Sequence, residues 1–280
     1  MPELPEVETI RRGILKYIVK HKIQDIEVLC EKSFLGEKKE IIGKKIVGIG
    51  RRGKAILIEL QDDFVMMIHL RMTGQLIFQG EERFAGGHPN ESFVSELPNK
   101  QTRVVISLEN GKLFFNDQRK FGFIKVLKKS EVQNDAFIKK LAKEPWEMSG
   151  EELYEKLRKK KVAVKAALLD QEIVAGLGNI YTDETLFLTG IRPETSTEKI
   201  SKEQAEKLIF NARKVMEKSI ELGGSTIQNY VNADGTRGNY LDKFAKVYGR
   251  EGKKCEQCGG KILKTRVAGR GTYYCEVCQK

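Results

Sequence analysis

The most reactive groups of this 280-residue sequence lie at its beginning, in "MPELPEVETI". If Met1 is removed, Pro2 presents a secondary amine with a pKa of about 8, so a useful fraction is neutral and can attack an aldehyde-like carbon. The product is a cationic iminium, which accepts electrons, and the adjacent Glu3 carboxylate can move protons or stabilise the charge. Two structural alternatives stand beside this chemistry: Pro5 can simply begin a helix, or the segment can be a frayed terminus.

Four cysteines near the other end have the spacing of a metal site. Cys255 and Cys258 form one C-x2-C pair, and Cys275 and Cys278 form a second pair sixteen residues later. Tetrahedral Zn²⁺ accepts four thiolates, and because these leave no position for water, we predict one structural zinc ion. Four unligated thiols are the alternative, and the distant Cys30 is expected to be an ordinary buried thiol.

The segment between the cysteine pairs, "KILKTRVAGRGTYY", has the pattern of a strand, a glycine turn and a second strand. We therefore expect a zinc-stapled β-hairpin with Arg270 near its tip. A cationic side chain at that position can contact a phosphate or enter a groove of nucleic acid.

A second cationic segment precedes a glycine turn. The stretch "KKKVAVKAALLDQ" contains Lys159 and Lys165 and is predicted to form a short helix. In "AGLGNIYTDE", Gly176 and Gly178 precede a helix that begins near Asn179. Free N–H groups at a helix N-terminus bind phosphate, so this pattern favours a clamp for a DNA backbone. A solvated lysine face followed by an ordinary turn is the alternative.

Two further motifs, "HLRMTG" and "NDQRKFG", combine a methionine with an arginine and a phenylalanine. Met72 follows one predicted strand, and Arg119 and Phe121 follow another. Taken alone, these side chains indicate core and surface positions. In a basic protein they can instead be wedges that unstack a base, a step that is needed if the base is flipped out for chemistry. The histidines show no metal-ligand spacing.

An N-terminal helix and a β-rich domain must position the first groups. Four apolar residues recur at helical spacing: Val7, Ile10, Ile14 and Ile18. From about residue 23 to 127, apolar and β-branched runs are broken by glycine, and Asn110-Gly111 is typical of a hairpin turn. We expect a sandwich or a barrel with a helix packed on it, followed by a polar interdomain linker over 128–137.

After about residue 135 the pattern becomes helical. Ser201 and Gln204 have the spacing of a capping box, and Gly223-Gly224 should end the helix that follows it. The polar, glycine-bearing stretch 225–240 is predicted to be a long loop, and such loops are often functional.

The charge balance indicates the class of partner. The net charge is +11, which a solvated surface does not require, so a polyanion is indicated, most simply nucleic acid. An anionic membrane is the rival, although the sequence contains no basic amphipathic anchor or lipidation motif. We also find no apolar run of membrane-spanning length and no signal-peptide pattern, and therefore expect a cytosolic protein without disulfides.

Seven motifs in the same order make the sequence resemble bacterial formamidopyrimidine-DNA glycosylases, also called 8-oxoguanine DNA glycosylases. They are "PELPEVETIRRG", "RRGK", "HLRMTG", "NDQRKFG", "GLGNIYTDE", "VYGREGKKC" and C-x2-C-x16-C-x2-C. The resemblance, which runs from residue 2 to about 280, implies an α+β fold with DNA in a basic cleft between domains. The implied domains are a catalytic β-sandwich with flanking helices over 1–130, a helical domain with a helix–two-turns–helix motif over 131–250, and a zinc finger over 251–280.

The resemblance also implies an activity, base-excision repair by a monomeric glycosylase that is also an abasic-site lyase. Such an enzyme flips 8-oxoguanine and formamidopyrimidines out of double-stranded DNA and excises them. It then cleaves the strand by β,δ-elimination. We expect such a protein in the bacterial cytoplasm, associated with the nucleoid and not with a membrane.

Catalytic roles follow from the resemblance, residue by residue. Pro2 matches the Schiff-base nucleophile that attacks C1′, and Glu3 matches its acid/base partner. Lys54, in "RRGK", matches a lysine of β-elimination and phosphate contact. Arg270 matches the arginine of δ-elimination, and Glu6 matches a supporting carboxylate.

The remaining implied contacts are with DNA. Met72, Arg119 and Phe121 match residues that fill the void left by the flipped base and contact its partner. The positions that match contacts to the DNA backbone are His69, Lys159, Lys165, Asn179 and Tyr248. The loop from Ser225 to Tyr240 matches a lid over the extruded base.

Two segments depart from the family pattern. The lid reads "DGTRGNY" where many relatives have Pro-Gly followed by two aromatic residues, so Arg237 and Asn239 leave base selectivity open. The segment "NKQTRVV" carries Lys100, Gln101 and Arg103 where relatives often have histidines, so a DNA-contacting histidine is missing.

Two rival functions remain at this stage. An endonuclease VIII-type enzyme would excise oxidised pyrimidines with the same proline chemistry, although "PELPEVET" and "DQRKFG" argue against it. A DNA-binding protein with an idle terminus would keep the zinc, the basic charge and the wedges.

Overall fold

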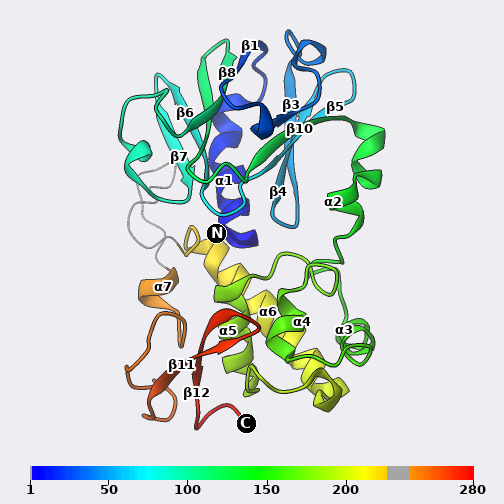
Figure 1. The fold of residues 1–280 in the computed structure, drawn as a ribbon, viewed down its shortest axis with the longest axis vertical. Helices are drawn as coiled ribbons and strands as arrows, with labels where there is room; N and C mark the ends of the chain where they lie inside the picture. The colour runs from blue at the N-terminus through cyan, green and yellow to red at the C-terminus, as the bar shows by residue number, and fades with distance from the viewer. Residues whose placement is uncertain (1, 226–239) are drawn as a thin grey trace. The chain divides into compact units, whose positions relative to one another are not determined.

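The computed structural model describes residues 2–225 and 240–280 (Figure 1). The chain divides into two compact units, Met1–Lys139 with Leu222–Asn239 and Lys140–Glu221 with Tyr240–Lys280. Each unit has a hydrophobic core of its own. The predicted division into three domains, with boundaries at 130 and 250, stays a prediction.

The first helix, α1 (Leu4–Ile18), begins at the proline-glutamate segment. Glu3 is its N-cap residue, and Pro5 lies in the first turn, where its missing N–H leaves no helical bond unmade. The four residues predicted at helical spacing are all buried: Val7, Ile10, Ile14 and Ile18. Pro2 itself is buried, so a frayed terminus is excluded from this residue onward.

In the described part of the first unit, ten strands form two five-stranded sheets. One sheet has the order β1-β8-β9-β6-β7 and the other β2-β10-β5-β4-β3. The strand bounds are β1 (Ile23–Val28), β2 (Phe34–Leu35), β3 (Ile46–Arg52), β4 (Ala55–Leu60), β5 (Phe64–His69), β6 (Gly74–Gly80), β7 (Arg83–Gly87), β8 (Thr102–Leu108), β9 (Gly111–Asp117) and β10 (Phe123–Lys128). All pairs are antiparallel except β2 with β10.

Both sheets and α1 contribute to one core, which confirms the sandwich and not the barrel. Ile14 of α1, Phe115 of β9 and Ile56 of β4 all belong to this core. The helix packs against both β3 and β7, each the last strand of its sheet, so α1 closes one side of the sandwich (Figure 1). The predicted hairpin is confirmed, since Leu108 pairs with Gly111 across the turn between β8 and β9.

The polar stretch 128–137, which the sequence predicts as the interdomain linker, is largely helical. It forms the 3-10 helix η4 (Lys129–Asn134) and leads into α2 (Ala136–Lys139). The Asp135 carboxylate accepts a 2.9 Å hydrogen bond from the N–H of Phe137 and pairs with Lys125 of β10 at 2.5 Å. These contacts dock the stretch on the first unit. Three more 3-10 helices lie in this unit: η1 (Glu31–Ser33), η2 (Lys38–Glu40) and η3 (Glu91–Phe93).

The second unit is helical and ends in a hairpin. Its described elements are α3 (Gly150–Leu157), α4 (Val164–Leu169), α5 (Asn179–Thr189), η5 (Thr197–Lys199), α6 (Lys202–Glu221), α7 (Tyr240–Lys243), β11 (Ile262–Val267) and β12 (Arg270–Cys275). The predicted capping box is present, because Ser201 N–H donates to Gln204 Oε1 and Gln204 N–H donates to Ser201 Oγ. The helix α6 ends at Glu221, and a single residue separates it from Gly223-Gly224, as predicted.

The hairpin packs on the helices through a small apolar cluster. Phe187 of α5, Val247 and Ile262 of β11 form it with the buried cysteines Cys255 and Cys275. The arrangement confirms the predicted α+β class with a C-terminal cysteine-bearing hairpin. Within the described residues, we find no helix that is long and apolar enough to cross a membrane.

Candidate active site and nucleic-acid interface

The start of α1 holds the proline and glutamate in a fixed conformation. The Glu3 N–H donates a 2.8 Å hydrogen bond to Oε2 of Glu6, and the Glu3 side chain accepts from the Glu6 N–H, which completes a capping box. The other oxygen of Glu6 accepts a 2.8 Å hydrogen bond from the N–H of Ser225. Glu6 therefore fastens two backbone segments beside Pro2. This placement agrees with the supporting role that the resemblance implies and not with a direct contact to DNA.

Lys54 lies in the two-residue turn between β3 and β4, where Arg52 pairs with Ala55. Such a tight turn requires a left-handed residue, and Gly53 supplies it with φ of +55°. Lys54 is buried. It lies near His69, because the next residue, Ala55, pairs with His69 in the neighbouring strand.

His69 is buried and neutral. Burial lowers the pKa of His69 to about 3, and the positive charges of Arg71 and Lys54 act in the same direction. Its Nδ1 accepts a 3.0 Å hydrogen bond from the N–H of Arg71, and its ring stands edge-on to Phe137 at 4.9 Å. The imidazole can donate one hydrogen bond through Nε2, but it carries no charge at neutral pH.

The three predicted wedge residues lie in two loops at the same end of adjacent strands. Met72 lies between β5 and β6, and Arg119 and Phe121 lie between β9 and β10, while Gly74 of β6 pairs with Asp117 of β9. Phe121 is 56% exposed, so the core alternative is wrong for this residue. Met72 is half-buried, and the Arg119 guanidinium lies 4.9 Å from the Phe121 ring.

Asp117 organises both loops and was missed by the sequence reasoning. Its buried carboxylate accepts hydrogen bonds from the N–H groups of Arg119, Phe121 and Gly122 at 3.1, 2.8 and 2.7 Å. It also accepts from the hydroxyl of Thr73, the neighbour of Met72. The signal was the acid inside "NDQRKFG", two residues before Arg119, since aspartate commonly caps a turn with its own carboxylate.

Arg103 has an internal role. Its guanidinium is buried and donates to the carbonyl oxygens of Asp117 at 2.7 Å and Lys100 at 3.0 Å. Arg103, in the segment that lacks the family histidine, therefore supports from inside the start of the wedge loop, the loop that carries Arg119 and Phe121.

Lys165 is not placed as a phosphate contact, which corrects its predicted role. Its side chain is fully buried, and Nζ pairs with Oδ1 of Asp183 at 2.6 Å. It donates further to the Gly271 carbonyl at 3.0 Å and to the Thr272 hydroxyl at 2.8 Å. A charge without solvent access requires a partner, and α5 supplies it.

The Lys165–Asp183 pair fastens the hairpin next to Arg270. The N–H of Tyr273 donates to Asp183 Oδ2 at 2.9 Å, and burial raises the pKa of Asp183 to about 6 although Lys165 opposes the shift. Asn179 also donates through Nδ2 to the Gly271 carbonyl at 2.9 Å. Asn179 therefore contributes to the same fastening at the beginning of α5.

The two other residues of this unit that are predicted to contact the DNA backbone, Lys159 and Tyr248, differ in exposure. Lys159 is exposed and Tyr248 is half-buried. Glu184 holds the Tyr248 segment, because its buried carboxylate accepts from the N–H groups of residues 246, 247 and 248 at 2.8 to 2.9 Å. Burial raises the pKa of Glu184, and the sequence reasoning did not single it out. Tandem acids in an otherwise uncharged helix, Asp183 and Glu184, were the signal.

The four cysteines converge as predicted. Their sulfur atoms all lie within 4.8 Å of one another, with 3.8 Å between Cys255 and Cys278 and 3.5 Å between Cys258 and Cys275. Four thiolates about 2.3 Å from a central zinc in a tetrahedral array are about 3.8 Å apart, so the cluster fits Zn²⁺.

Arg270 lies at the tip of the hairpin between the cysteine pairs, as predicted. Val267 pairs with Arg270, and the two residues between them, Ala268 and Gly269, have φ values of +48° and +72°. Both central residues are left-handed, as in the turn that matches the twist of a β-ribbon. Arg270 is exposed.

Each unit thus gathers its own set of candidate residues. In the first unit these are Pro2, Glu3, Glu6, Lys54, His69, Met72, Arg119, Phe121 and Ser225. In the second they are Lys159, Lys165, Asn179, Tyr248, Arg270 and the four cysteines. The lid prediction falls mostly on 226–239, including Arg237 and Asn239, and this part lies outside the described residues.

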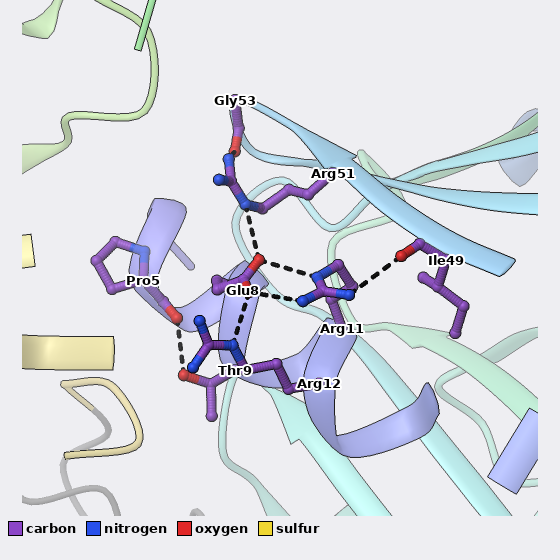
Figure 2. Close-up of polar contacts among 8 residues, drawn as sticks. All are labelled: Pro5, Glu8, Thr9, Arg11, Arg12, Ile49, Arg51 and Gly53. Carbon is purple, nitrogen blue, oxygen red and sulfur yellow. Dashed lines mark hydrogen bonds and ion pairs between the residues drawn. The ribbon is translucent and has the colours of Figure 1, made fainter. Parts of the chain in front are cut away.

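One buried acid on α1 was also missed. Glu8 lies among three arginines, Arg11, Arg12 and Arg51 (Figure 2). Burial alone raises its pKa, but the hydrogen bonds and charges of the arginines outweigh it and lower the pKa of Glu8 to about 2. The carboxylate is therefore ionised at neutral pH.

Comparison with known families covers most of the chain. Residues 1–124 match the formamidopyrimidine-DNA glycosylase N-terminal domain, 141–231 match the formamidopyrimidine-DNA glycosylase H2TH domain, and 252–280 match a zinc finger found in FPG and IleRS.

Relatives that match over their whole length are named formamidopyrimidine-DNA glycosylases. Formamidopyrimidine-DNA glycosylase of Desulfitobacterium hafniense is 38% identical over 286 residues, and that of Lactococcus lactis subsp. cremoris is 41% identical over 287 residues. Each match covers 100% of both chains.

Solved structures of Lactococcus lactis FPG have the same fold. A mutant in complex with DNA containing Fapy-dG superposes with a TM-score of 0.88 at 38% identity. The protein bound non-covalently to DNA containing an AP site gives 0.86 at 37% identity. Both comparisons cover 100% of each chain.

Proposed function

The chain belongs to the formamidopyrimidine-DNA glycosylase family, and on that premise we propose that Pro2 and Glu3 carry out the chemistry of its base excision. The protein is a base-excision repair glycosylase for DNA, with the lyase activity of its family. One observation carries the assignment of the two residues: Pro2 and Glu3 are buried together at the start of α1, and Glu6 fixes their backbone. A nucleophile and an acid on one fixed element can meet the same sugar carbon.

Pro2 acts first, as the nucleophile. Its nitrogen lone pair forms a bond to C1′ of the damaged nucleotide, and the N-glycosidic bond breaks with its electrons leaving on the base. The amine proton passes to the departing base. The nitrogen lone pair then forms a C1′=N double bond as the C1′–O4′ bond breaks, and Glu3 gives a proton to O4′. The product is a cationic Schiff base between Pro2 and the opened sugar.

Strand cleavage follows from this cation. Loss of a proton from C2′ moves electrons toward the iminium, and their return expels the phosphate from C3′. A second proton loss, from C4′, expels the phosphate from C5′. We assign Lys54 to the first elimination and Arg270 to the second, because a cation beside a departing phosphate stabilises the charge that develops there.

Side chains from both units hold the DNA open. Met72, Arg119 and Phe121 fill the space of the flipped base and offset an unstacking cost of a few kcal/mol. Lys159, Asn179 and Tyr248 contact phosphates, and Lys165 supports the hairpin from within. The partner is double-stranded DNA with oxidised purines or abasic sites, and we place the enzyme in the bacterial cytoplasm, on the nucleoid.

The zinc site has a structural role. Cys255, Cys258, Cys275 and Cys278 hold one Zn²⁺, and four thiolates leave no open position for substrate. When bound, the ion ties the two ends of the hairpin together, so that Arg270 projects from a rigid turn.

Borohydride trapping tests the nucleophile. Borohydride reduces a Schiff base to a stable amine, so the protein should crosslink to a duplex containing 8-oxoguanine, with the adduct on an N-terminal peptide that begins at Pro2. Glu3→Gln should bind the lesion and fail to excise it. An undamaged duplex should yield no adduct. An adduct on Lys54, or normal excision by the Glu3 variant, would overturn the assignment.

A further inference from the structure

Glu8 connects the helix of the nucleophile to the neighbouring strand. It lies in α1 five residues after Glu3, and its carboxylate is mostly buried. Arg11 donates to it through Nε and Nη2 at 3.0 and 2.8 Å, and Arg12 through Nε at 2.7 Å. These two arginines belong to the same helix as Glu8, whereas the third donor comes from β3.

Arg51 spans the distance from that carboxylate to the turn of Lys54. Its Nε donates to Oε2 of Glu8 at 3.1 Å, and its Nη1 donates to the carbonyl of Gly53 at 2.9 Å. Figure 2 shows the guanidinium between the two acceptors, with Glu8 on one side and Gly53 on the other. The side chain is 13% exposed, so both bonds are largely sheltered from solvent.

The β3–β4 hairpin, which carries Lys54 in its turn, lies at the edge of its sheet. Among the described strands, β3 is the last of its sheet and pairs only with β4, so no described strand lies on the outer side of the β3–β4 hairpin. Edge elements with few neighbours open more readily than central ones. Arg11 adds a second attachment, because its Nη1 donates to the Ile49 carbonyl of β3 at 3.1 Å.

We propose that Glu8 and Arg51 are positioning residues. They hold the turn of Lys54 at a fixed position relative to the N-terminus of α1, where Pro2 and Glu3 lie. The inference rests on the elimination role of Lys54 in the proposed function. Glu8 is the anchor on α1, and Arg51 is the bridge to the turn. Neither touches the reacting atoms.

The bridge is tested with Arg51→Lys on a duplex that contains an abasic site, which removes base excision from the measurement. Lysine keeps the charge, but its single ammonium cannot hold Glu8 and the Gly53 carbonyl in the geometry of a guanidinium fork. The single-turnover rate of strand cleavage should fall about tenfold or more at saturating enzyme, since small displacements of a catalytic group cost 10- to 100-fold. Borohydride trapping through Pro2 should be retained.

Arg12→Gln is the matched control. Arg12 also donates to Glu8, but no contact of Arg12 with the Lys54 turn is found in the described structure, so its cleavage rate should stay near wild type. Glu8→Gln should lower the rate of strand cleavage to a similar extent as Arg51→Lys. Where Glu8→Gln folds poorly, Arg51→Lys alone decides the proposal.

A double variant separates positioning from general damage. If Arg51 acts through Lys54, adding Arg51→Lys to Lys54→Met should cause no further loss. A further loss equal to that in the wild-type background overturns the proposal, as does an Arg51→Lys rate equal to that of Arg12→Gln. Cleavage by Lys54→Met at the wild-type rate also overturns it, yet leaves Pro2 in place if trapping persists. Absence of trapping in wild type defeats the proposed function itself.

Discussion

At the scale of single residues, burial decides what a charged or titratable side chain can do. His69 and Lys165 both match backbone-contact positions, and both are buried. Burial and the positive charges of Arg71 and Lys54 keep the histidine neutral, whereas the lysine keeps its charge because an acid lies beside it. Within one set of predicted contacts, the structure thus contains a neutral hydrogen-bonding group and an internal ion pair.

The neutral state of His69 predicts how stability depends on pH. Its pKa is about 3 in the folded chain against 6.5 for the model group, so the unfolded chain binds its proton first. The stability that His69 contributes is present above pH 6.5 and is lost as the pH falls toward 3. Urea denaturation of His69→Gln should therefore lose about 2 kcal/mol less than wild type between pH 7 and 4.5.

Wild type, measured over the same pH range, provides the reference curve. Identical curves for wild type and His69→Gln would contradict a neutral, buried His69.

At the scale of elements, single buried acids fix loops that carry exposed side chains. Asp117 binds three backbone N–H groups of the wedge loop, Glu184 binds those of the Tyr248 segment, and Asp183 binds the hairpin strand β12. A carboxylate with several N–H donors replaces the regular ladder bonds that a loop lacks. The loops can thus present Arg119, Tyr248 and Arg270 from defined backbones.

The Lys165–Asp183 pair predicts a separable effect on Arg270. The double variant Lys165→Met with Asp183→Asn removes both buried charges but keeps an acceptor for the Tyr273 N–H. It should retain about one equivalent of zinc, because the four thiolates are unchanged. The ratio of δ- to β-elimination product should fall a few-fold, since Gly271 and Thr272 beside Arg270 lose their hydrogen bonds to Lys165. Gel analysis of cleaved abasic duplex gives the ratio.

Cys258→Ser serves as the comparison at the same element. It should lose zinc and DNA binding together, because the hairpin loses its staple. If the charge-removal variant also loses its metal, the pair maintains the whole finger, and the specific link to Arg270 is refuted.

At the scale of the whole molecule, the chain is basic and consists of two compact units. The net charge of +11 favours any DNA, so charge cannot select a lesion. Selection must come from flipping and from the groups that meet the flipped base and its partner. The wedge loop belongs to the first unit and the hairpin of Arg270 to the second.

The wedge residues Met72, Arg119 and Phe121 predict the order in which substrates are excised. Arg119 carries several donors, so it can bond the acceptor edge of an unpaired cytosine, and this geometry changes opposite adenine. Single-turnover excision should be faster for 8-oxoguanine opposite cytosine than opposite adenine, and slowest for thymine glycol. Met72→Ala should slow excision most where the damaged base is in an intact pair, and least where it is already unpaired. Faster release of thymine glycol than of 8-oxoguanine opposite cytosine would instead favour an endonuclease VIII-type specificity.

Sequence alone determined the parts that depend on neighbours along the chain. The zinc site follows from two C-x2-C pairs, the hairpin of Arg270 from its glycine turn, and the start of α6 from Ser201 and Gln204. In each case the interacting groups lie within a few residues or on one hairpin. Local geometry therefore leaves few alternatives.

Tertiary structure decided which charges are internal. Lys165 meets Thr272 across 107 positions of sequence, and Arg51 meets Glu8 across 43. No local pattern distinguishes a lysine that faces solvent from one that pairs with a buried acid. The difference is the desolvation of the charge, which depends on what packs around it. The zinc site could be predicted from the sequence, and the chemistry of Pro2 stays a prediction from it, whereas the contacts that support Lys54, Arg119 and Arg270 became visible only in the fold.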